Sequence, residues 1–430
     1  MPHALDLFQG LWVQHPWAIV FSLAGYIAVV RLLRYRRVKT IDAPFAHGQR
    51  KLSSMTSEEA HAIISQLQEF EFPYAFNKAR KIALLKAGGI PTMSKLFAVT
   101  GQNNKRNSGK RAVDTEILLR EAQSQPRDSN RYSTAVARMN YLVYSLTPHI
   151  SRHARYRKAN KITDPDLLHT LGDGLAEILN VIDRDEWRKL TDVEKCALGV
   201  FHKNLGEDMG IPFEPLASSH EGWRDGLHFA MELRDWTIRY EEAVARPVAT
   251  NDQYVRVYVD AALAGLPGFV TKTVRKMLAA DLDEVMRTSL CLEKPGPILV
   301  FVLSCIRQTR KAFLQCFALP RFSAVKPVHE TADPRTNRYH FGRQTLQPWY
   351  MEPTLWSTWG SGALLVRMLG GKVPGSRGDR YHPQGYDLMT IGPDPQKERG
   401  AEEMRPDIEV IKSRAVATCP FSQAKAGGFN

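Results

Sequence analysis

The sequence predicts a mainly α-helical protein with one membrane-spanning helix near its N-terminus. Helix-start signals recur along the first 320 residues, whereas alternating strand patterns with turn dipeptides are almost absent. An unbroken apolar run also lies close to the start of the chain. A chain of 430 residues is long enough to bury a large core. We therefore expect a helical bundle behind a membrane anchor, followed by a loop-rich C-terminal extension.

The N-terminal segment predicts the anchor. Residues Trp17–Val30 are apolar without a break, and apolar neighbours extend the expected span to about 12–33. No lysine or arginine precedes this run, whereas five follow it in "RLLRYRRVK". A cleaved signal peptide would carry its basic residues before the apolar core. Because basic flanks stay on the cytoplasmic side, we predict a single-pass anchor, residues 1–39, with the body in the cytosol.

Residues 40–320 predict a body made of helices. Three of these helices begin with a threonine followed three residues later by an acidic residue, which is the spacing of a capping box. The pairs are Thr56–Glu59, Thr163–Asp166 and Thr191–Glu194. Apolar residues at helical intervals follow each pair. Further helices are expected at 223–245, 251–264, 268–290 and 296–317.

The composition changes after Pro320. Residues 321–392 are rich in Pro, Gly, Arg and Tyr, and they predict loops packed on the helical body. Residues 393–430 lack a clear apolar period, so we expect a disordered tail.

Charge and cysteine content narrow the possible partners. The net charge of +13 favours weak attraction to anionic surfaces. No zinc-finger spacing and no basic strand studded with aromatic residues appears, so nucleic acid is not an expected partner. The five cysteines are scattered and form no C-x-x-C pair, which argues against a disulfide framework or a structural zinc site.

One polar cluster stands out in the absence of familiar hydrolase or nucleotide-binding motifs. In "SGKRAVDTEILLRE", Arg111, Asp114 and Thr115 fall at i, i+3 and i+4, so all three are expected on one helix face. Two interpretations stay open at this point. The segment is either an ordinary helix start with a salt bridge or a polar cluster over a bound cofactor.

Several histidines are candidate ligands. His149 and His153 follow a helix break at Pro148, and His169 and His202 lie in apolar helices. A lone histidine in a helix is usually an ordinary core or surface residue. A haem iron, however, needs only one such nitrogen on its proximal side. Haem is therefore harder to exclude than zinc.

Several longer blocks carry a family resemblance. In chain order they are "FPYAFNKA", "GIPTMSKL", "KRAVDTEILL", "ARMNYL", "KANKITDPDLLHTL", "DEWRKLTDVEKCALGVFHKNLGEDMGIPF", "GWRDGLHF" and "YHPQGY". Together they closely resemble the fungal ER-bound oxygenase family, the mpaB family, which is related more distantly to bacterial latex-clearing rubber oxygenases. The similarity runs from the anchor to about residue 390.

The resemblance implies a haem b enzyme of the endoplasmic reticulum membrane with a globin-reminiscent, rubber-oxygenase-like helical fold. Such enzymes use dioxygen to cleave a carbon–carbon double bond in a prenyl or polyisoprenoid chain. The implied partners are the bilayer and a lipophilic, prenylated small molecule of the kind found in secondary metabolism. Two alternatives remain open. One is a membrane-tethered helical protein that binds a lipid or a partner without catalysis, and the other is an oxygenase of the same scaffold with a non-prenyl substrate.

The resemblance also assigns site residues. An Arg-x-x-x-Thr pair lies on the distal side of the haem in this family, and it matches Arg111 and Thr115. Asp114 stands where rubber oxygenases can place a lysine as distal ligand, so distal ligation by lysine is not expected here. His169 is expected to line the cofactor pocket. His202 stands where relatives usually carry a tryptophan, and no catalytic role is assigned to it.

The proximal haem ligand implied by the resemblance is His153. Fungal members typically read N-Y-L-H before an aromatic and basic run, whereas here Val143 follows Leu142 directly. Removing residues 143–152 restores "NYL" followed by "HARYRKANKI", with His153 in the ligand position. Pro148 cannot continue a helix without losing a hydrogen bond. Our hypothesis is that the ten inserted residues loop out and leave His153 as the ligand.

Overall fold

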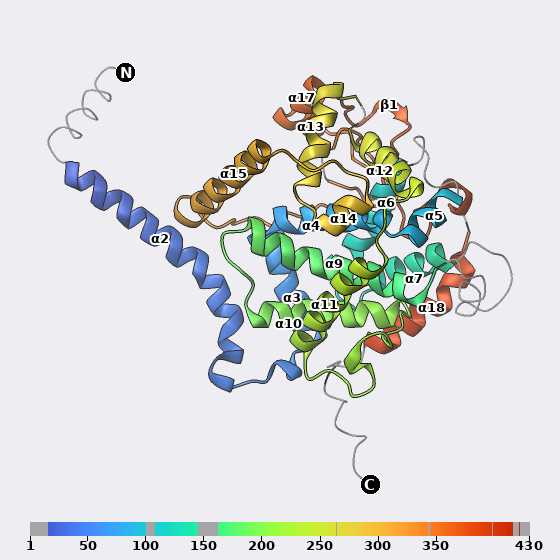
Figure 1. Ribbon diagram of the computed structural model, residues 1–430, viewed down its shortest axis with the longest axis horizontal. Coiled ribbons are helices and arrows are strands. Elements are labelled where there is room, and N and C mark those ends of the chain that lie inside the picture. The colour runs from blue at the N-terminus through green and yellow to red at the C-terminus, as the bar shows by residue number, and fades with distance from the viewer. Residues whose placement is uncertain are drawn as a thin grey trace, which may run out of the picture.

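Helices make up most of the structure (Figure 1). The computed structural model describes residues 16–99, 108–144, 162–263, 265–342, 345–397, 399–415 and 421. Within these ranges the β structure is limited to one short strand, β1 (Ser376–Asp379), and two isolated bridges. The predicted fold class, mainly α with an N-terminal apolar helix, is confirmed.

The N-terminal apolar segment forms one long helix, α2 (Pro16–Asp42). Its first half projects away from the body, and its second half packs against it (Figure 1). Val30 is the first buried residue of the helix, directly before the basic flank. Among the described segments, the region Trp17–Ala46 is the one single helix that is long and apolar enough to cross a bilayer.

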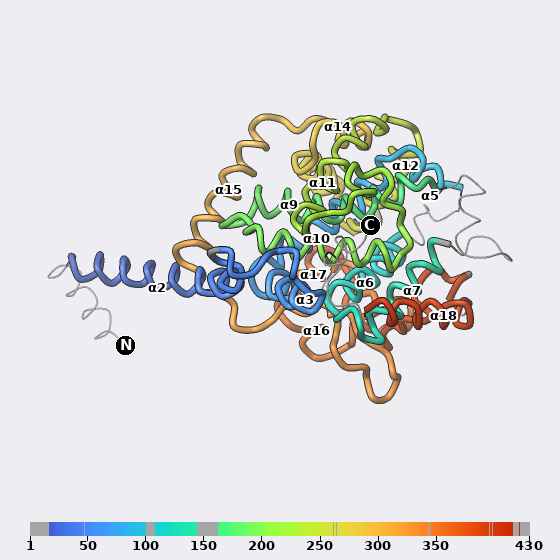
Figure 2. Tube along the Cα trace, turned by 90° about the horizontal axis from the view of Figure 1, so that it is seen from below, coloured from blue at the N-terminus to red at the C-terminus, as the bar shows by residue number. Residues whose placement is uncertain are grey.

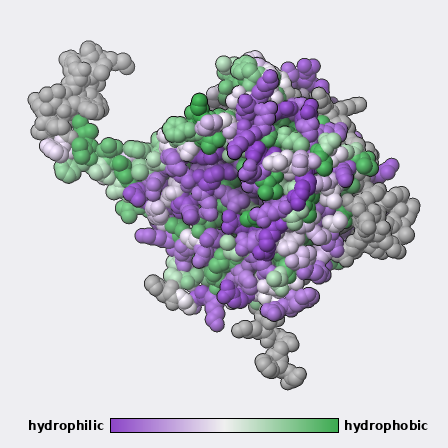
Figure 3. All heavy atoms as spheres, in the orientation of Figure 1, coloured by the Kyte–Doolittle hydropathy of each residue, from purple (hydrophilic) through white to green (hydrophobic). Residues whose placement is uncertain are grey.

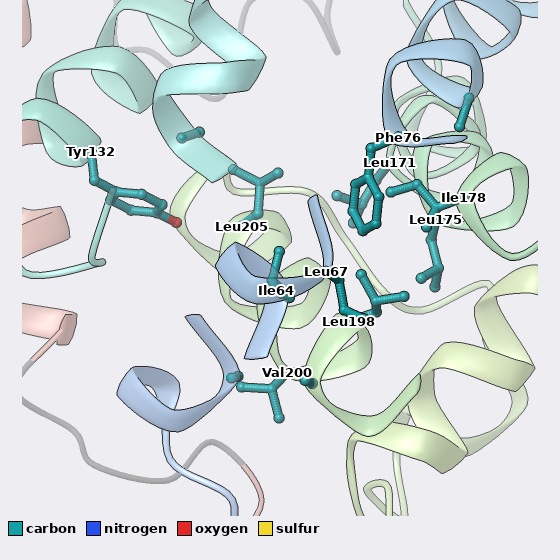
Figure 4. Packing of buried hydrophobic residues seen from close by; sticks show 14 of the residues in the cluster. Ile64, Leu67, Phe76, Tyr132, Leu171, Leu175, Ile178, Leu198, Val200 and Leu205 are labelled. Atoms are coloured by element: carbon teal, nitrogen blue, oxygen red, sulfur yellow. The ribbon is translucent and has the colours of Figure 1, made fainter. Parts of the chain in front are cut away.

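The core is a layer of helices that pack on one another in the middle of the molecule. It contains α3 (Ser57–Gln66), α4 (Pro73–Lys86), α9 (Asp164–Asp185), α10 (Asp192–Asp208) and α11 (Gly226–Val244). Figure 4 shows how apolar side chains from four of these helices meet. The labelled residues from these helices are Ile64, Phe76, Leu171, Leu175, Ile178, Leu198, Val200 and Leu205.

Local sequence signals explain where these helices begin and how closely they approach. All three predicted capping boxes form, because each threonine side chain accepts from the backbone of its acidic partner and receives the reciprocal bond. The tightest approach is between α10 and α11. A Cβ atom on Gly199 would lie 1.8 Å from the carbonyl oxygen of Gly226, so the two backbones touch at a point where no larger residue fits.

A second group of helices lies beside the core. It contains α6 (Ser108–Ser124), α7 (Asn130–Tyr144) and α18 (Ala401–Ala415), with α7 packed between the other two. The helix α18 lies within 393–430, the segment expected to be disordered. Its Met404 and Ile411, seven residues apart, are both buried against the core. Two apolar residues seven positions apart lie on the same face of a helix, so this face packs on the core although the segment as a whole is polar.

One buried side chain explains how the chain before α18 is held. The guanidinium of Arg138 on α7 donates to four backbone carbonyls. They belong to Thr390, Ile391, Gln396 and Arg399, at distances of 2.7 to 3.1 Å. These bonds give hydrogen-bond partners to partly buried carbonyls of an irregular segment.

The remaining helices surround this body. They are α5 (Pro91–Val99), α12 (Ala249–Ala262), α13 (Gly268–Ala279), α14 (Glu284–Ser289), α15 (Pro297–Cys316), α16 (Leu355–Trp359) and α17 (Ser361–Met368). The expected single helix 268–290 is divided, because Asp283 caps a new helix through the backbone N–H of Met286 at 2.8 Å. Short turns of other helix types lie at Ala43–Gly48, Leu52–Ser54, Leu67–Glu71, Ala87–Gly89, Ala217–Ser219 and Asp394–Gln396.

Candidate functional site

The predicted site begins with Arg111 in the first turn of α6. Its guanidinium carbon lies 4.4 Å from the ring centre of Phe97 on α5. Burial lowers the pKa of Arg111, and the hydroxyl of Tyr254 on α12 partly offsets this effect. Within the described ranges no carboxylate forms an ion pair with Arg111. Arg111 is half-buried. A cation partly removed from water without an anion is unfavourable, so this position suits an anionic or strongly polar ligand.

The surroundings of Arg111 are apolar. Two small clusters of buried apolar residues meet at Phe97, and they lie between α5, α12, α14 and the ends of α7 and α9. Their buried members are Leu85, Ile90, Met93, Ile162, Ala245, Tyr254, Val255, Val259, Met286 and Leu290. Val143, the first residue of the predicted insertion, packs on the first of these clusters from the end of α7.

Asp114 and Thr115 differ in their surroundings. Thr115 is half-buried one turn after Arg111. The carboxylate of Asp114 instead accepts a 2.6 Å hydrogen bond from the hydroxyl of Tyr350 and lies 2.8 Å from the ammonium of Lys110. Burial raises the pKa of Asp114, and Lys110 opposes this rise. The helix α6 contains all three residues at the predicted spacing, and the carboxylate of Asp114 is hydrogen-bonded to Tyr350 of the C-terminal extension.

Both histidines of the predicted insertion region, His149 and His153, lie outside the described residues. The segment that contains them leaves α7 at Tyr144 and returns at Ile162, and both ends border the apolar clusters around Phe97. A guanidinium that forms no ion pair with any described residue and borders apolar side chains fits the distal side of a haem. The assignment of His153 as proximal ligand stays a prediction.

His169 belongs to a different cluster. Its Nε2 lies 2.9 Å from a carboxylate oxygen of Glu241 on α11, and its ring packs 5.6 Å from that of Tyr240. The side chain is fully buried. The structure thus joins His169 to an ionic cluster in the core, and no described contact links it to Arg111 or Thr115. Its predicted position in the cofactor pocket stays a prediction.

The ionic cluster has Lys86 at its centre. The ammonium of Lys86 lies 2.8 Å from Glu241, 3.1 Å from Glu177 and 3.2 Å from Asp173. The side chains of these residues and of His169 are at most 6% exposed. Because His169, Asp173 and Glu177 follow one another at intervals of four, α9 presents all three on one face.

The charges in this cluster compensate one another. Burial acts to lower the pKa of Lys86, but the three carboxylates outweigh it and hold that pKa well above its ordinary value. Burial raises the pKa of Asp173. Burial also acts to raise the pKa of Glu241, but the hydrogen bond from His169 and the charge of Lys86 outweigh it and lower that pKa. Ligand atoms of His169, Asp173 and Glu241 lie within 4.8 Å of one another, a spacing suited to a metal ion. The Lys86 ammonium already supplies the positive charge there, so we interpret the cluster as structural.

His202 on α10 is a buried neutral histidine. Its Nδ1 donates to the carbonyl oxygen of Leu198 at 2.7 Å, and its ring packs edge-on against Phe201 at 5.1 Å. Burial lowers the pKa of His202 to about 4. The side chain fills space between α9 and α10, with its Nε2 3.9 Å from the place where a side chain on Gly174 would begin.

A small cavity lies near the C-terminal end of α6, away from Arg111. It is lined by residues of the π-helical turn after α3, by Arg120 and Ser124, and by the chain near Val325. Its volume of about 40 Å³ is enough for one or two water molecules and far too small for a porphyrin.

Comparisons with known proteins identify relatives over nearly the whole chain. The chain is 32% identical over 406 residues to "ER-bound oxygenase mpaB'" of Penicillium brevicompactum, and the match covers 94% of each protein. It is 31% identical over 394 residues to "ER-bound oxygenase mpaB" of the same organism, with 90% of each covered. A third relative, "ER-bound oxygenase mpaB" of Penicillium roqueforti (strain FM164), is 37% identical over 270 residues, which are 62% of this chain and 87% of that protein. No family model matches the chain.

Some residues of this region were not predicted from the sequence. Phe97 and Tyr254 are the described neighbours of Arg111, but they come from helices far away in the chain. The signal for Lys86 was present, because this lysine interrupts the apolar helix "KIALLKAGG". The four-residue spacing of His169, Asp173 and Glu177 was also visible, although it does not identify the cation that the three residues face.

Replacing Lys86 tests whether the cluster stabilises the core. We expect Lys86→Met to lower the free energy of unfolding by about 3–5 kcal/mol, because it leaves buried carboxylates without their cation. The measurement is urea unfolding of the purified chain in detergent. Lys195→Met is the matched control, since Lys195 pairs with exposed Asp192 at 3.1 Å, and such a pair contributes at most about 1 kcal/mol. Equal effects of the two substitutions would contradict the role of Lys86.

His202 predicts how stability depends on pH. Between pH 6.5 and pH 4 the unfolded chain protonates this histidine while the folded protein keeps it neutral. The contribution of His202 to the free energy of unfolding is therefore fully present above pH 6.5. It falls as the pH is lowered, and roughly 3 kcal/mol is lost by pH 4. We expect His202→Leu to lose less unfolding free energy between pH 7 and pH 4.5 than the unchanged protein. The exposed His220→Leu should follow the unchanged protein, and a parallel loss in all three would refute the prediction.

Proposed function

Because this chain belongs to the mpaB family of ER-bound oxygenases, we propose that it is a membrane-anchored haem b enzyme that cleaves a carbon–carbon double bond with dioxygen. The proposed substrate is the prenyl chain of a lipophilic small molecule, and the proposed site is the endoplasmic reticulum membrane. The observation that carries the proposal is Arg111. Its half-buried guanidinium packs on Phe97 beside apolar residues, without an ion-pair partner among the described residues.

The residues of the chain would divide the work as follows. His153 would hold the haem iron, and the haem would supply the binding and activation of dioxygen. Arg111 would stabilise negative charge that develops on oxygen, since a fixed cation is most effective in a site from which water is excluded. Thr115 would donate a hydrogen bond beside it. Phe97 packs on the guanidinium, and the apolar residues around it would limit the access of water.

The anchor suits the proposed substrate. A prenylated compound partitions into the bilayer, so an enzyme held at the membrane meets it more often. The apolar residues of the expected span, about 12–33, would cross the bilayer, and the basic residues at its end, from Arg31 onward, would lie on the cytosolic side. This orientation would place the helical body in the cytosol.

The haem assignment predicts one essential histidine. We expect His153→Ala to abolish the Soret band and the reduced CO-difference spectrum of the purified protein, because the iron would lose its protein ligand. His149→Ala is the control, since His149 lies four residues earlier in the same segment, and it should keep both signals. Deletion of residues 143–152 should also keep haem if the insertion loops out. Normal haem content in His153→Ala would end the assignment, and a chain without any Soret band would favour a non-catalytic lipid- or partner-binding protein.

Arg111 predicts a loss of turnover without a loss of cofactor. With a panel of prenylated phenols as substrates, we expect Arg111→Leu to slow dioxygen consumption by about 10²–10³-fold, the usual effect of removing one group that stabilises developing charge. Haem content should not change. Arg239→Leu, at an exposed position of α11, is the control and should keep full activity. Full activity in Arg111→Leu would disprove the role given to the guanidinium.

A further inference from the structure

We propose that α15, α16, α17 and the start of α13 form a lipid-binding face that lies on the membrane surface beside the anchor. This inference rests on the proposed membrane anchor and adds a second contact to it. The proposed binding partner of this face is the membrane leaflet that lies next to the helical body and that α2 would cross. The name lipid face is used below for Pro297–Cys316, Leu355–Met368 and Phe269.

The helix α15 exposes its apolar residues and turns its charged residues toward the body, the opposite of an ordinary surface helix. None of its residues is buried, although its first half reads "PILVFVLSCI". Phe301 is 69% exposed and Ile306 is 58% exposed. A helix on the surface of a soluble protein turns its apolar stripe toward the core and its charges toward water. Here the apolar stripe faces outward.

The charged residues of α15 face the body instead. Arg307 lies 2.7 Å from Asp281, and Arg310 lies 2.9 Å from Glu186 and donates to the carbonyl of Asp185 at 2.8 Å. These bonds fix the rotation of α15 about its own axis. The exposed apolar stripe is therefore held by ion pairs on the opposite side of the helix, and it is not a loosely placed segment.

The anchor sets the position of α15 relative to the bilayer. The hydroxyl of Tyr26 on α2 donates to the carbonyl of Phe317 at 2.8 Å, and Arg34 donates to that of Ala318 at 2.7 Å. Arg37 donates to the carbonyl of Arg321. The end of α15 is thus tied to the stretch of α2 where apolar residues give way to basic ones. In a membrane protein, this stretch lies at the boundary between acyl chains and headgroups.

The other parts of the lipid face lie on the same side of the body. Figure 1 shows that α15, α17 and the outer end of α13 lie on the side toward which the free half of α2 projects. Figure 2 shows α15 beside α2 from a second direction. The turn before α13 packs closely against the end of α17. A Cβ atom on Gly265 would lie only 2.8 Å from the carbonyl oxygen of Gly370. Figure 3 shows apolar residues over these elements and along α2.

The chemistry of the face fits a membrane surface. Trp356 and Trp359 of α16 are 75% and 62% exposed, and tryptophan favours the headgroup layer. The guanidinium of Arg367 lies 4.2 Å from the ring centre of Trp359. Exposed Lys272 and Lys276 on α13 add positive charge, which the anionic cytoplasmic leaflet attracts. A second copy of the chain would match the apolar residues, but it would not explain why the face lies level with the polar end of the span.

The native cysteines allow a direct test in the full-length chain. Cys305 lies on the exposed side of α15, and Cys291 is exposed directly after α14. In one variant Cys305 is kept as the reactive thiol, and in another Cys291 is kept. In both, the other accessible cysteines are replaced by Ser. Each is labelled with a nitroxide and inserted into phosphatidylcholine–phosphatidylserine vesicles. Collision with lipid-soluble oxygen and with a water-soluble nickel chelate is then measured by EPR.

We expect the oxygen-to-nickel collision ratio to be about tenfold higher at Cys305 than at Cys291, since apolar faces of interfacial helices enter the acyl boundary. Adding Phe301→Asp to the Cys305 variant should remove the difference without unfolding the protein, because Phe301 is exposed. A Leu23→Cys label on α2 tests the anchor separately. Oxygen access at residue 23 with nickel access at Cys305 would overturn the lipid face and leave the anchor intact. Nickel access at both would overturn the anchor, and protection of Cys305 from both reagents would identify a second copy as the occupant.

Discussion

The placement of α5, the helix that carries Phe97 to the candidate site, depends on the ammonium group of Lys86. It lies at the end of α4 and meets carboxylates from α9 and α11 in a region that water does not reach. Buried charges are stable only while all their partners are in place, so the cluster fixes how these three helices are rotated against one another. It also fixes where the chain goes next. The turn Ala87–Gly89 leads directly into α5, and α5 carries Phe97 to the guanidinium of Arg111. The site thus depends on a cluster that contributes none of its chemistry.

The helix α6 contacts the C-terminal extension through Lys110 and Asp114, and it contacts α5 through Arg111. Asp114 is hydrogen-bonded to Tyr350 and paired with Lys110, and Lys110 also donates to the carbonyl of Gly392 at 2.6 Å. These contacts join α6 to the C-terminal extension and prevent the helix from turning. Arg111, three residues before Asp114, is then held toward α5 and α12. The charge of Asp114 is therefore compensated by Lys110, one helical turn before it, and not by Arg111.

Local features of this fold could be predicted from the sequence, and contacts between distant segments could not. The capping boxes and the long N-terminal apolar helix were predictable because each depends on a few neighbouring residues. The helix that carries Arg111 and Asp114 was predictable, whereas the partner of each side chain was not, because Phe97 and Tyr350 come from distant segments. The helix α18 was missed because it depends on burial of Met404 and on Arg138, which lies far away in the chain. The candidate site shares this limit, since Phe97 and Tyr254 reach Arg111 only in the folded protein.

The proposed lipid face would orient the helical body on the membrane, in addition to keeping it near the membrane. The helix α12 places Tyr254 near Arg111, and α13 follows it in the chain with Phe269 exposed on the lipid face. The candidate site and the proposed lipid face are thus connected by two consecutive helices. A prenyl chain that leaves lipid for water loses about 0.8 kcal/mol for each methylene group. A substrate with several isoprene units would therefore enter the body most readily where protein and lipid are in contact. Fixing the body at the membrane surface by two contacts, α2 and α15, would hold that entrance against the leaflet, which an anchor on a flexible linker would not do.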